Sequence, residues 1–537
     1  MNLGEQIIAK YEKSKNTRTN WDHHWQEVAD LVLPTREFTY DLTPGEKRRN
    51  KIFNDTAPNA ASSLASALAG MLTNTSIRWF ALGLNDPKLA GREDVKRYLY
   101  ESTSVMLEYF DSTRSQFALA SHEMYLDLVA FGTAVMYLNT EGDDLVFQAK
   151  KLSNFYVMEN EAGVVTESYR QFSMTIRDAM DVFGEELSPN SLRMADPNHR
   201  NYDPEGEVNF VHAIYKRQDR DPYRIDVENK PYASIYVELD TKHVVRESGF
   251  DHMPYLVPRW SKAPEETYGR GPAMHALPGI KIANALSRTI LEASELAIRP
   301  PIMVAANSIE GPIRTTPGSI LYYRSGAREV PQPLVSGANP SVGEALLAKQ
   351  EARIEEYFFL DNLKLPMNDR MTATEITARR QQGLMTASPV LSRLYSEWLN
   401  PLIEFTYGFM RQKGYLPEPP EVLKGRTVTI EYRSPMAASK KSAENQAFMQ
   451  SLQTILPLMQ ANPGILDILN TDDLVRGVMF NNGVDPRYIK PENQVQQERQ
   501  QKAQAQQQAM MAQQIQQQAA AARDASAAAK QLGEIGG

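Results

Sequence analysis

The stretch GIKIANALSRTILEASELAIRPP at residues 279–301, together with SVGEALLAKQEARIEEYFFL at residues 341–360, decides the fold of this chain. Both segments carry apolar residues at helical spacing. The first ends at a proline pair, which cannot donate backbone hydrogen bonds and which constrains the residue before it. The second opens with Ser341 and Glu344, a capping box whose side chains satisfy free amides at a helix start. The sequence therefore predicts two helices separated by an insertion.

The segment between these helices has the character of short strands. Ile302–Ala305 and Ser319–Tyr323 are mostly apolar or aromatic, and the Gly-Pro and Pro-Gly pairs nearby predict turns. A compact β-rich insertion is therefore expected. The predicted bounds are 276–299 for the first helix, 300–340 for the insertion and 341–360 for the second helix.

The N-terminal side of the chain, residues 1–275, is predicted to be an α+β domain. Apolar residues at helical spacing predict helices over 5–33, 59–72, 94–110 and 115–131. Short β-branched or aromatic runs predict a small antiparallel sheet over 135–165 and further strands at 208–215, 233–239 and 244–247. Residues 189–204 are predicted to be a loop.

The C-terminal side is predicted to be mainly helical. After a loop at residues 361–371, Thr372 and Glu375 make a second capping box, which opens a helix that reaches about Gly414. Pro389 lies inside this helix, where its missing amide and its ring predict a kink. A strand is expected at 427–432, and helices at 440–459 and 465–479. The fold class is thus α+β and predominantly helical.

Residues 492–532 contain neither glycine nor proline and are dominated by glutamine and alanine. They are either disordered low-complexity sequence or a helix of high propensity. A stripe of mostly small residues favours the helix, and it comprises Ala505, Ala509, Ala512, Ile515, Ala519, Ala522 and Ser526. Because such a stripe cannot stabilise a single helix in water, we expect packing against the same helix of identical subunits.

Composition restricts the classes of function. The chain has 537 residues, and its 66 acidic against 58 basic residues give a net charge of -8, which disfavours nonspecific adhesion to nucleic acid. Cysteine is absent, so disulfides, thiolate catalysis and cysteine-based metal sites are excluded. No secretion signal is recognisable, and the apolar stretch at residues 126–138 is shorter than the roughly 20 residues of a membrane span. No membrane association is expected.

Catalytic motifs are not found. His122-Glu123 lacks the second histidine of a zinc helix, because Leu126 stands in its place. His23 and His24 are adjacent and point apart, which favours an ordinary helix surface over metal binding. Solvated turns or caps account best for the acidic pairs Asp143-Asp144 and Asp472-Asp473. Since a phosphate-binding loop and a nucleophile elbow are also missing, we expect no enzyme, no cofactor and no metal site.

Two loops carry basic residues with more than one interpretation. Gly269 and Gly271 around Arg270 favour a tight loop before a helix over a phosphate site, and Arg270 is a candidate for pairing with a neighbouring subunit. Lys364 and Arg370 are solvated by default, and contact with nucleic acid would require an assembled geometry.

The order of these parts resembles that of bacteriophage portal proteins, specifically the head-to-tail connectors of short-tailed, T7-like phages. Several local strings carry the resemblance: Trp79-Phe80 after Leu64-Ala-Ser66, Arg259-Trp260, Tyr268-Gly-Arg-Gly-Pro272, Ala297-Ile-Arg-Pro-Pro301 and Arg370-Met-Thr-Ala-Thr-Glu375. It extends over essentially the whole chain.

The resemblance implies a homo-oligomeric ring, expected to be dodecameric, at one capsid vertex of the virion. DNA would enter through it during packaging and leave through the tail, and assembly would take place in the cytoplasm of the bacterial host. The implied parts are a wing at 1–275, stem helices at 276–299 and 341–360, a clip at 300–340, a tunnel loop at 361–371, a kinked long helix with a return strand at 372–438, a crown at 439–484 and a C-terminal helical barrel at 485–537.

Partners and site residues follow from the same resemblance. The expected partners are a tail adaptor protein, the terminase large subunit, the major capsid and scaffolding proteins, and double-stranded DNA that passes without sequence specificity. The implied residues of the DNA channel, in the tunnel loop, are Lys364, Asn368 and Arg370. The implied residues of the clip interface are Ile309, Arg314, Tyr322 and Arg324.

Charge in the two stem helices suits the passage of DNA. Five carboxylates, Glu292, Glu295, Glu351, Glu355 and Glu356, outnumber Arg288, Arg299, Lys349 and Arg353, so weak adhesion to DNA is expected. One alternative function is a scaffold or internal virion protein that uses the Gln/Ala segment as an assembly arm. Another, a terminase-like nuclease or ATPase, would require clustered acidic metal ligands or a phosphate loop.

Overall fold

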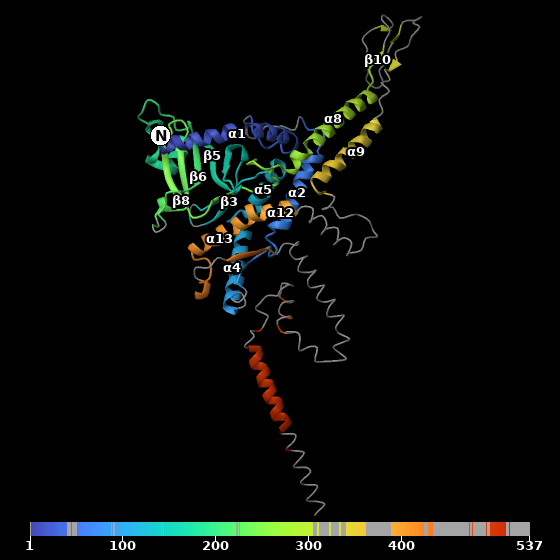
Figure 1. Ribbon diagram of the computed structural model, residues 1–537. Helices are drawn as coiled ribbons and strands as arrows, with labels where there is room; N and C mark the ends of the chain where they lie inside the picture. Colours follow the sequence, from blue (N-terminus) through green and yellow to red (C-terminus); the bar gives the residue numbers. More distant parts are fainter. Residues whose placement is uncertain are drawn as a thin grey trace, which may run out of the picture. The chain divides into compact units, whose positions relative to one another are not determined.

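A computed structural model describes residues 2–39, 51–86, 92–303, 340–360, 388–432 and 494–511, apart from short breaks in some of these ranges, and isolated positions elsewhere. The chain divides into two compact units. The first comprises Met1–Leu82, Glu101–Pro417 and Ile430–Met436, and the second comprises Gly83–Tyr100, Glu418–Thr429 and Ala437–Gly537. The fold mixes helices and antiparallel sheets, as predicted (Figure 1).

Helices account for most of the first unit outside its sheets. The longer ones are α1 (Leu3–Val32), α2 (Thr56–Leu72), α5 (Phe117–Phe131), α8 (Pro272–Ile298), α9 (Pro340–Tyr357) and α13 (Asn400–Gln412), and the shorter ones are α6 (Ile176–Phe183), α7 (Pro189–Ala195) and α12 (Ser388–Leu394). Helix α4 (Glu93–Asp111) has residues in both units. One-turn 3-10 helices occur at Leu152–Asn154, Gly184–Glu186, Val227–Asn229 and Glu421–Leu423.

A five-stranded antiparallel sheet is the main sheet of the first unit. Its strands lie in chain order, β4-β5-β6-β7-β8, and are β4 (Phe155–Glu159), β5 (Val165–Thr175), β6 (Glu207–Lys216), β7 (Tyr232–Glu238) and β8 (Val244–Phe250). The register pairs Tyr169 with Ala213 and Phe172 with Phe210. Each strand is thus joined to the next by a local connection, as sequence alternation leads us to expect.

Helices cover both faces of this sheet. On one face, Ile7, Ile8 and Tyr11 of α1 pack against buried β6 and β7 residues such as Val211 and Ile235. On the other face, Ile176, Ala179 and Phe183 of α6 pack against Phe210 of β6 and Val245 of β8. Alternate residues along β6 therefore belong to different cores, because successive side chains of a strand point to opposite faces.

Smaller sheets complete the fold. A three-stranded sheet has the order β3-β2-β9 and contains β2 (Met136–Asn139), β3 (Val146–Ala149) and β9 (Tyr255–Leu256). Strand β1 (Phe80–Gly83) pairs with β14 (Thr429–Tyr432). In the insertion between α8 and α9, β10 (Ile302–Met303) pairs with β13 (Gln332–Pro333), and β11 (Ile309–Glu310) pairs with β12 (Tyr322–Tyr323). The described residues of the insertion thus include four short strands, and the rest of the predicted β-rich insertion lies outside the described residues.

Three predictions of local structure were wrong. Residues 189–204 are not wholly a loop, because Ser188 caps a short helix, α7, with Pro189 at its first position. Helix α6 was missed, since two amphipathic turns in a predominantly β region are a weak signal. Helix α8 begins at Pro272, four residues before the predicted start at residue 276, and it accommodates Pro278 in its interior.

The long helix predicted from Thr372 to Gly414 is described only from Ser388 onward. There α12 passes through a π-helical turn, Tyr395–Leu399, into α13. The kink at Pro389 stays a prediction, as do the helices at 440–459 and 465–479, which fall largely outside the described residues. Within the second unit, residues 494–511 are helical, and Arg499 pairs with Asp472 at 2.6 Å.

Among the described residues, no helix is long and apolar enough to cross a membrane.

Candidate functional site

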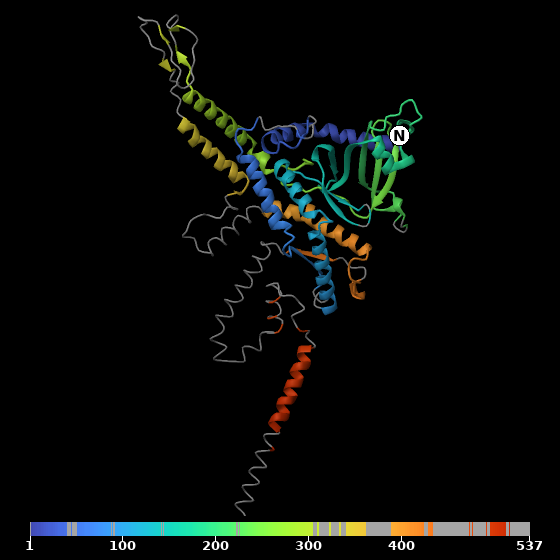
Figure 2. The same cartoon turned by 180° about the vertical axis from the view of Figure 1, so that it is seen from behind.

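Helices α8 and α9, called here the helix pair, lie side by side and project from the first unit, with β10 beyond the end of α8 (Figures 1 and 2). At one end, here called the base, Ala273, Leu277 and Ile280 of α8 are buried, as are Phe358 and Leu360 after α9. At the other end, the tip, Ile298 is 77% exposed. The pair is therefore anchored at its base.

Glycines in the loop before α8 fix this anchor. Gly132 ends α5 in the left-handed conformation, and a Cβ atom there would lie 2.2 Å from the Gly271 nitrogen. A Cβ atom on Gly269 would lie 2.3 Å from the Gly132 oxygen. Only glycines permit this close approach of two backbones. The Tyr268-Gly-Arg-Gly-Pro272 string thus packs the start of α8 closely against the end of α5. This packing explains the two glycines without a phosphate site.

Arg270 of the same string has partners within its own chain. Its Nε donates to Glu266 Oε2 at 3.0 Å, and its guanidinium lies 4.9 Å from the centre of the Trp21 ring. Pairing with a neighbouring subunit, which the sequence suggested, is therefore not required to satisfy this charge.

The two helices of the pair contact each other closely at one glycine. Gly343 of α9 faces Ile290 of α8, and a Cβ atom on Gly343 would lie 2.9 Å from Ile290 Cγ1. Nearer the base, a Cβ atom on Gly279 would lie 3.9 Å from Ile354 Cγ1. These two contacts define an antiparallel register in which residue 279 stands opposite 354 and residue 290 opposite 343.

Between residues 51 and 54 the chain is fastened to the side of α8. Asn284 Oδ1 accepts hydrogen bonds from the amides of Phe53 at 2.7 Å and Asn54 at 3.2 Å. Its Nδ2 donates to the Lys51 carbonyl at 2.9 Å. A single asparagine side chain thus holds three residues of an irregular segment, as expected for a buried or half-buried backbone that needs partners.

The same segment also joins the two helices. Asn54 Nδ2 donates to Ser287 Oγ of α8 at 3.3 Å and to Glu351 Oε1 of α9 at 2.7 Å. The lower half of the helix pair is therefore held by contacts from both helices and from the segment before α2.

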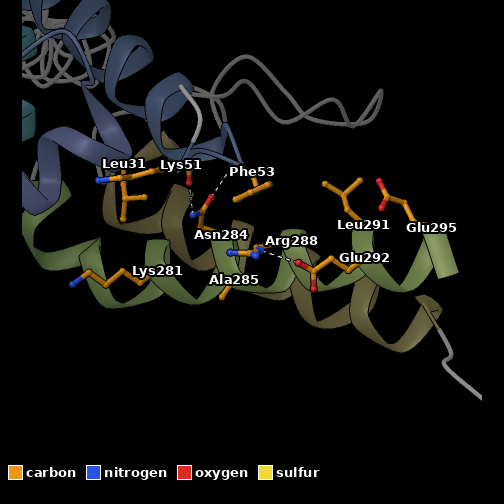
Figure 3. Close-up of a pocket in the computed structure, with 10 residues that line it drawn as sticks. All are labelled: Leu31, Lys51, Phe53, Lys281, Asn284, Ala285, Arg288, Leu291, Glu292 and Glu295. Carbon is orange, nitrogen blue, oxygen red and sulfur yellow. Dashed lines mark hydrogen bonds and ion pairs between the residues drawn. The ribbon is translucent and has the colours of Figure 1, made fainter. Parts of the chain in front are cut away.

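A groove lies between this segment and α8, with a volume of about 720 Å³ (Figure 3). Leu31, Phe53 and Leu291 supply apolar surface. Arg288 lies 5.7 Å from the centre of the Phe53 ring and pairs with Glu292 at 2.8 Å. The groove is thus lined by both apolar and charged side chains, and the charged ones are Lys51, Lys281, Arg288, Glu292 and Glu295.

Large apolar side chains are exposed along the whole pair. Leu291 is 53% exposed and Val342 is 59% exposed. The others are Ile282, Leu296, Ile298, Leu346 and Tyr357, with Ile302 and Met303 directly beyond α8. A projecting element covered by such residues is unusual for a monomer, so the pattern marks an interaction surface.

Charge on the pair is close to balanced, which weakens the predicted acidic bias. When Glu344 and Lys281 are included, residues 276–299 and 341–360 carry six carboxylates and five cations. Part of this charge is paired on the helix surface, as between Arg288 and Glu292.

A buried ionic cluster fixes the π-helical turn near the base. Arg259 is 1% exposed and donates to Glu159 at 2.8 Å and to Glu397 of that turn at 2.7 Å. Lys262 also donates to Glu159, at 2.7 Å. Burial by itself would raise the pKa of Glu159, but the hydrogen bonds from Lys262 and Arg259 outweigh it and hold this pKa below its ordinary value.

The predicted site residues are only partly described. Ile309 lies in β11 and Tyr322 in β12, and these strands pair, so the backbone brings the two residues into one small sheet. The other two predicted clip residues, Arg314 and Arg324, lie outside the described residues. So do the three tunnel-loop residues, Lys364, Asn368 and Arg370.

Residues dismissed as metal or catalytic candidates have ordinary surroundings. His24 is half-buried, and burial, with nearby Arg270, lowers its pKa. His122 Nε2 lies 3.2 Å from Ser66 Oγ. Across the part of the chain that the structure describes, no group of three His, Asp or Glu side chains could hold a metal ion.

Sequence reasoning missed several residues that shape this site. Asn54, Asn284 and Glu397 carry the contacts that hold the helix pair and the π-helical turn, yet none belongs to a recognisable local pattern. Arg259 was noted only as part of a string. Its Arg-Trp dipeptide directly after the apolar run Tyr255-Leu-Val-Pro258 was the one available signal.

Comparison with known proteins shows which family the chain belongs to. A family model described as bacteriophage head to tail connecting protein matches residues 4–489. The portal protein of Salmonella phage epsilon15 is 32% identical over 516 residues, covering 93% of this chain and 91% of its own length.

The chain belongs to the bacteriophage head-to-tail connecting protein family. It therefore has the role of a portal connector, as the resemblance predicted. The probable portal protein of Bordetella phage BPP-1 is 29% identical, covering 93% of this chain and 90% of its own. The portal protein of Enterobacteria phage T3 is 24% identical and covers 78% of this chain.

Solved structures show a more remote likeness. A chain in the virion of the native gene transfer agent particle aligns with 79% of this connector and 94% of its own length, at 10% identity and a TM-score of 0.37. A chain in the neck of the native particle covers 74% of this connector, with a TM-score of 0.36. These scores are too low to compare details of the fold.

Proposed function

We propose that copies of this chain form a closed ring, with twelve subunits expected, at one capsid vertex of the virion. Double-stranded DNA passes through the central channel during packaging and again during ejection. The chain acts as a conduit and docking platform, and carries out no catalysis of its own.

The observation that carries this proposal is the exposed apolar surface of the helix pair. Exposing several large apolar side chains costs free energy, at roughly 25 cal/mol per Å² of surface. A ring of identical subunits removes this cost, since each helix pair is covered by the pairs on either side of it. Family membership as a head-to-tail connector supports the same arrangement, and the match to portal proteins over 93% of the chain argues against the scaffold alternative.

In this proposal the parts of the chain have distinct tasks. Residues 1–275 make the wing, the helix pair makes the stem, and residues 300–340 make the clip. The clip, with Ile309, Arg314, Tyr322 and Arg324, docks the terminase large subunit during packaging and a tail adaptor afterwards. The wing and crown contact the major capsid and scaffolding proteins.

The channel lining is proposed to lie in the tunnel loop. Residues 361–371 project toward the DNA, with Lys364, Asn368 and Arg370 as the contacts. The near-balanced charge of the stem suits weak adhesion, because DNA that must slide cannot be held by many cationic contacts at once. Residues 372–438 return to the wing, residues 439–484 form the crown, and residues 485–537 form a helical barrel.

Negative-stain electron microscopy of the purified chain tests the proposal directly. We expect ring-shaped particles with a central hole and one dominant rotational symmetry. Size-exclusion chromatography with light scattering should give the mass of a closed ring, about 730 kDa if twelve 60.5 kDa subunits are present. Monomers or open filaments at micromolar concentration would contradict it.

A further inference from the structure

The groove on α8 and the exposed face of α9 are complementary in residue type. On α9, an exposed stripe at steps of three and four residues consists of Tyr357, Arg353, Lys349, Leu346 and Val342, in order from base to tip. These residues lie on one side of the helix, away from the line of contact with α8 through Gly343 and Ile354. From base to tip, the stripe therefore has an aromatic side chain, then two cationic side chains, and then two apolar side chains.

The side of α8 that faces the groove presents its residue types in an order that matches the α9 stripe. From base to tip, beyond Lys281 and Arg288, it presents Leu291 beside Phe53, then Glu292 and Glu295, and then Ile298. Leu291 with Phe53, the two carboxylates and the apolar tip therefore lie in the order in which the α9 stripe presents an aromatic ring, two cations and apolar side chains. Opposite charges placed at matching positions favour one partner and one register.

The charges on these two faces are available for a partner. Lys349, Arg353 and Glu295 are exposed and make no ion pair with any of the residues that the structure describes. Glu292 pairs with Arg288 at 2.8 Å, on the surface, where such a pair contributes little by itself. A neighbouring cation would therefore add to this surface without breaking a buried interaction.

The two faces cannot meet within one chain. The register that places residue 290 opposite 343 puts Leu346 opposite residue 287, eleven residues from Ile298 along α8. At 1.5 Å per residue the two side chains are about 16 Å apart along the helix axis. A contact between Leu346 of the α9 stripe and Ile298 of the α8 face must therefore join two copies of the chain.

We propose that in the assembled ring the α8 groove of each subunit receives Tyr357 of an adjacent subunit, with Arg353 and Lys349 of that subunit pairing with Glu292 and Glu295. The contact is heterologous, since one subunit gives α8 and the other gives α9, and such contacts form a ring when the rotation from one subunit to the next closes. This inference rests on the proposed ring and specifies which surfaces close it.

Because the natural chain has no cysteine, disulfide trapping gives a clean test. The variant carries both Ile298→Cys, at the exposed tip of α8, and Leu346→Cys, at an exposed position of α9. A disulfide needs Cα atoms within about 7 Å, which excludes a bond within one chain at this separation. We expect a covalent ladder of multimers on non-reducing gels, collapsing to monomer on reduction.

Controls separate this contact from ring formation itself. Each single cysteine variant, and the pair Val182→Cys with Leu346→Cys, whose first site is exposed on α6, should give no ladder beyond dimer. Rings visible by electron microscopy without a ladder in the Ile298/Leu346 variant would overturn this inference and leave the proposed ring standing. Absence of rings in the natural chain would overturn both.

A charge exchange provides an independent measurement. Glu295→Lys alone and Lys349→Glu alone should each reduce the fraction of chain found in rings, because like charges then face each other. The double variant Glu295→Lys/Lys349→Glu should recover it. Failure of the double variant to recover, with both singles impaired, would overturn the pairing.

Discussion

At the residue scale, Arg259 shows how much of this connector depends on one buried cation. Its guanidinium is held by Glu159 and Glu397, and also donates to the carbonyls of Thr267 at 3.0 Å and Gly163 at 2.7 Å. Three segments distant in the sequence, 159–163, 259–267 and the turn with Glu397, thus meet at one side chain. Removing one member of such a cluster leaves charges and carbonyls desolvated without a partner.

We predict that Arg259→Met lowers the free energy of unfolding by about 3 kcal/mol, because Glu159 and Glu397 lose their shared partner. Chemical denaturation followed by tryptophan fluorescence measures the change. The matched control is Arg177→Met, which removes an exposed pair with Glu205 and should cost less than about 1 kcal/mol. Equal effects of the two substitutions would contradict this account.

His212 is a second residue whose surroundings allow a prediction, in this case of how stability depends on pH. His212 is fully buried in the main sheet, stacked on Tyr236 at 4.1 Å and within hydrogen-bond distance of Ser234 and Tyr255. Burial, helped by the positive charge of Arg170, lowers its pKa to about 3. The imidazole therefore stays neutral in the folded chain where an unfolded chain would take up a proton.

The sign of the pH effect follows from that lowered pKa. Above about pH 6.5 neither state binds the proton, and between about 6.5 and 3 only the unfolded state does, so stability falls as pH falls, by about 1.4 kcal/mol per unit. We predict that His212→Phe, which keeps the ring stacking, lacks this contribution. Denaturation curves at pH 7, 6 and 5 measure it, and parallel pH profiles of the two proteins would contradict the prediction.

At the element scale, the helix pair contains two glycines whose difference is steric. Glycine in a helix interior costs about 1 kcal/mol relative to alanine. Gly279 has room for a methyl group beside Ile354, whereas Gly343 has none beside Ile290. The same substitution should therefore act in opposite directions at the two positions.

We predict that Gly279→Ala raises the free energy of unfolding by about 0.5–1 kcal/mol, and that Gly343→Ala gives no gain or a loss of about 1 kcal/mol, because it forces α8 and α9 apart. Thermal unfolding of both variants measures the difference. Adding Ile290→Val to Gly343→Ala should restore part of the loss. If Gly343→Ala instead raised the free energy of unfolding, the close packing of Gly343 against Ile290 would be contradicted.

At the scale of the whole molecule, the proposed tunnel loop is where the assembly would contact DNA. Lys364 and Arg370 stand in residues 361–371, between the stem and the long helix. In a ring, each such residue is repeated once per subunit around the channel. A modest cationic contact is thereby multiplied, which makes these two positions sensitive sites for packaging and retention of DNA.

We predict that Lys364→Ala/Arg370→Ala leaves ring assembly unchanged and alters DNA packaging or the retention of packaged DNA. Electron microscopy of the purified variant checks assembly, and the DNA content of phage particles made with it checks function. The control is Arg177→Ala, which removes an exposed cation of α6, outside both the loop and the helix pair. Normal packaging and retention by the double variant would refute the tunnel-loop assignment.

Much of the fold could be predicted because its elements have strong local patterns. The periodicity of residues 5–33 predicts α1, and alternation predicts β6, β7 and β8 to within a few residues. Prediction failed where local signals compete. The first helix of the pair starts four residues earlier than its predicted bound at residue 276, and it holds Pro278 in its interior, because burial of the helix base against α1 and α5 outweighs the lost hydrogen bond.

The candidate site was predictable in outline and not in detail. The proline pair after α8 and the cap near the start of α9 mark the helix pair, and family strings mark its function. The contacts that hold it are different in kind: Asn54 reaches Glu351 across 297 positions of sequence. Such pairs leave no local pattern, since neither residue has a helical or strand preference that reveals its partner.

By itself, the sequence of this connector determined most of its longer elements, its mixture of helix and sheet and, through resemblance, its family, because these follow from local periodicity and short strings. The tertiary structure alone decided which face of each element is buried, where Arg259 and His212 find their partners, and which side chains of the helix pair stay exposed. The physical reason is that burial and pairing depend on distances between segments far apart in the chain, and those distances exist only after folding.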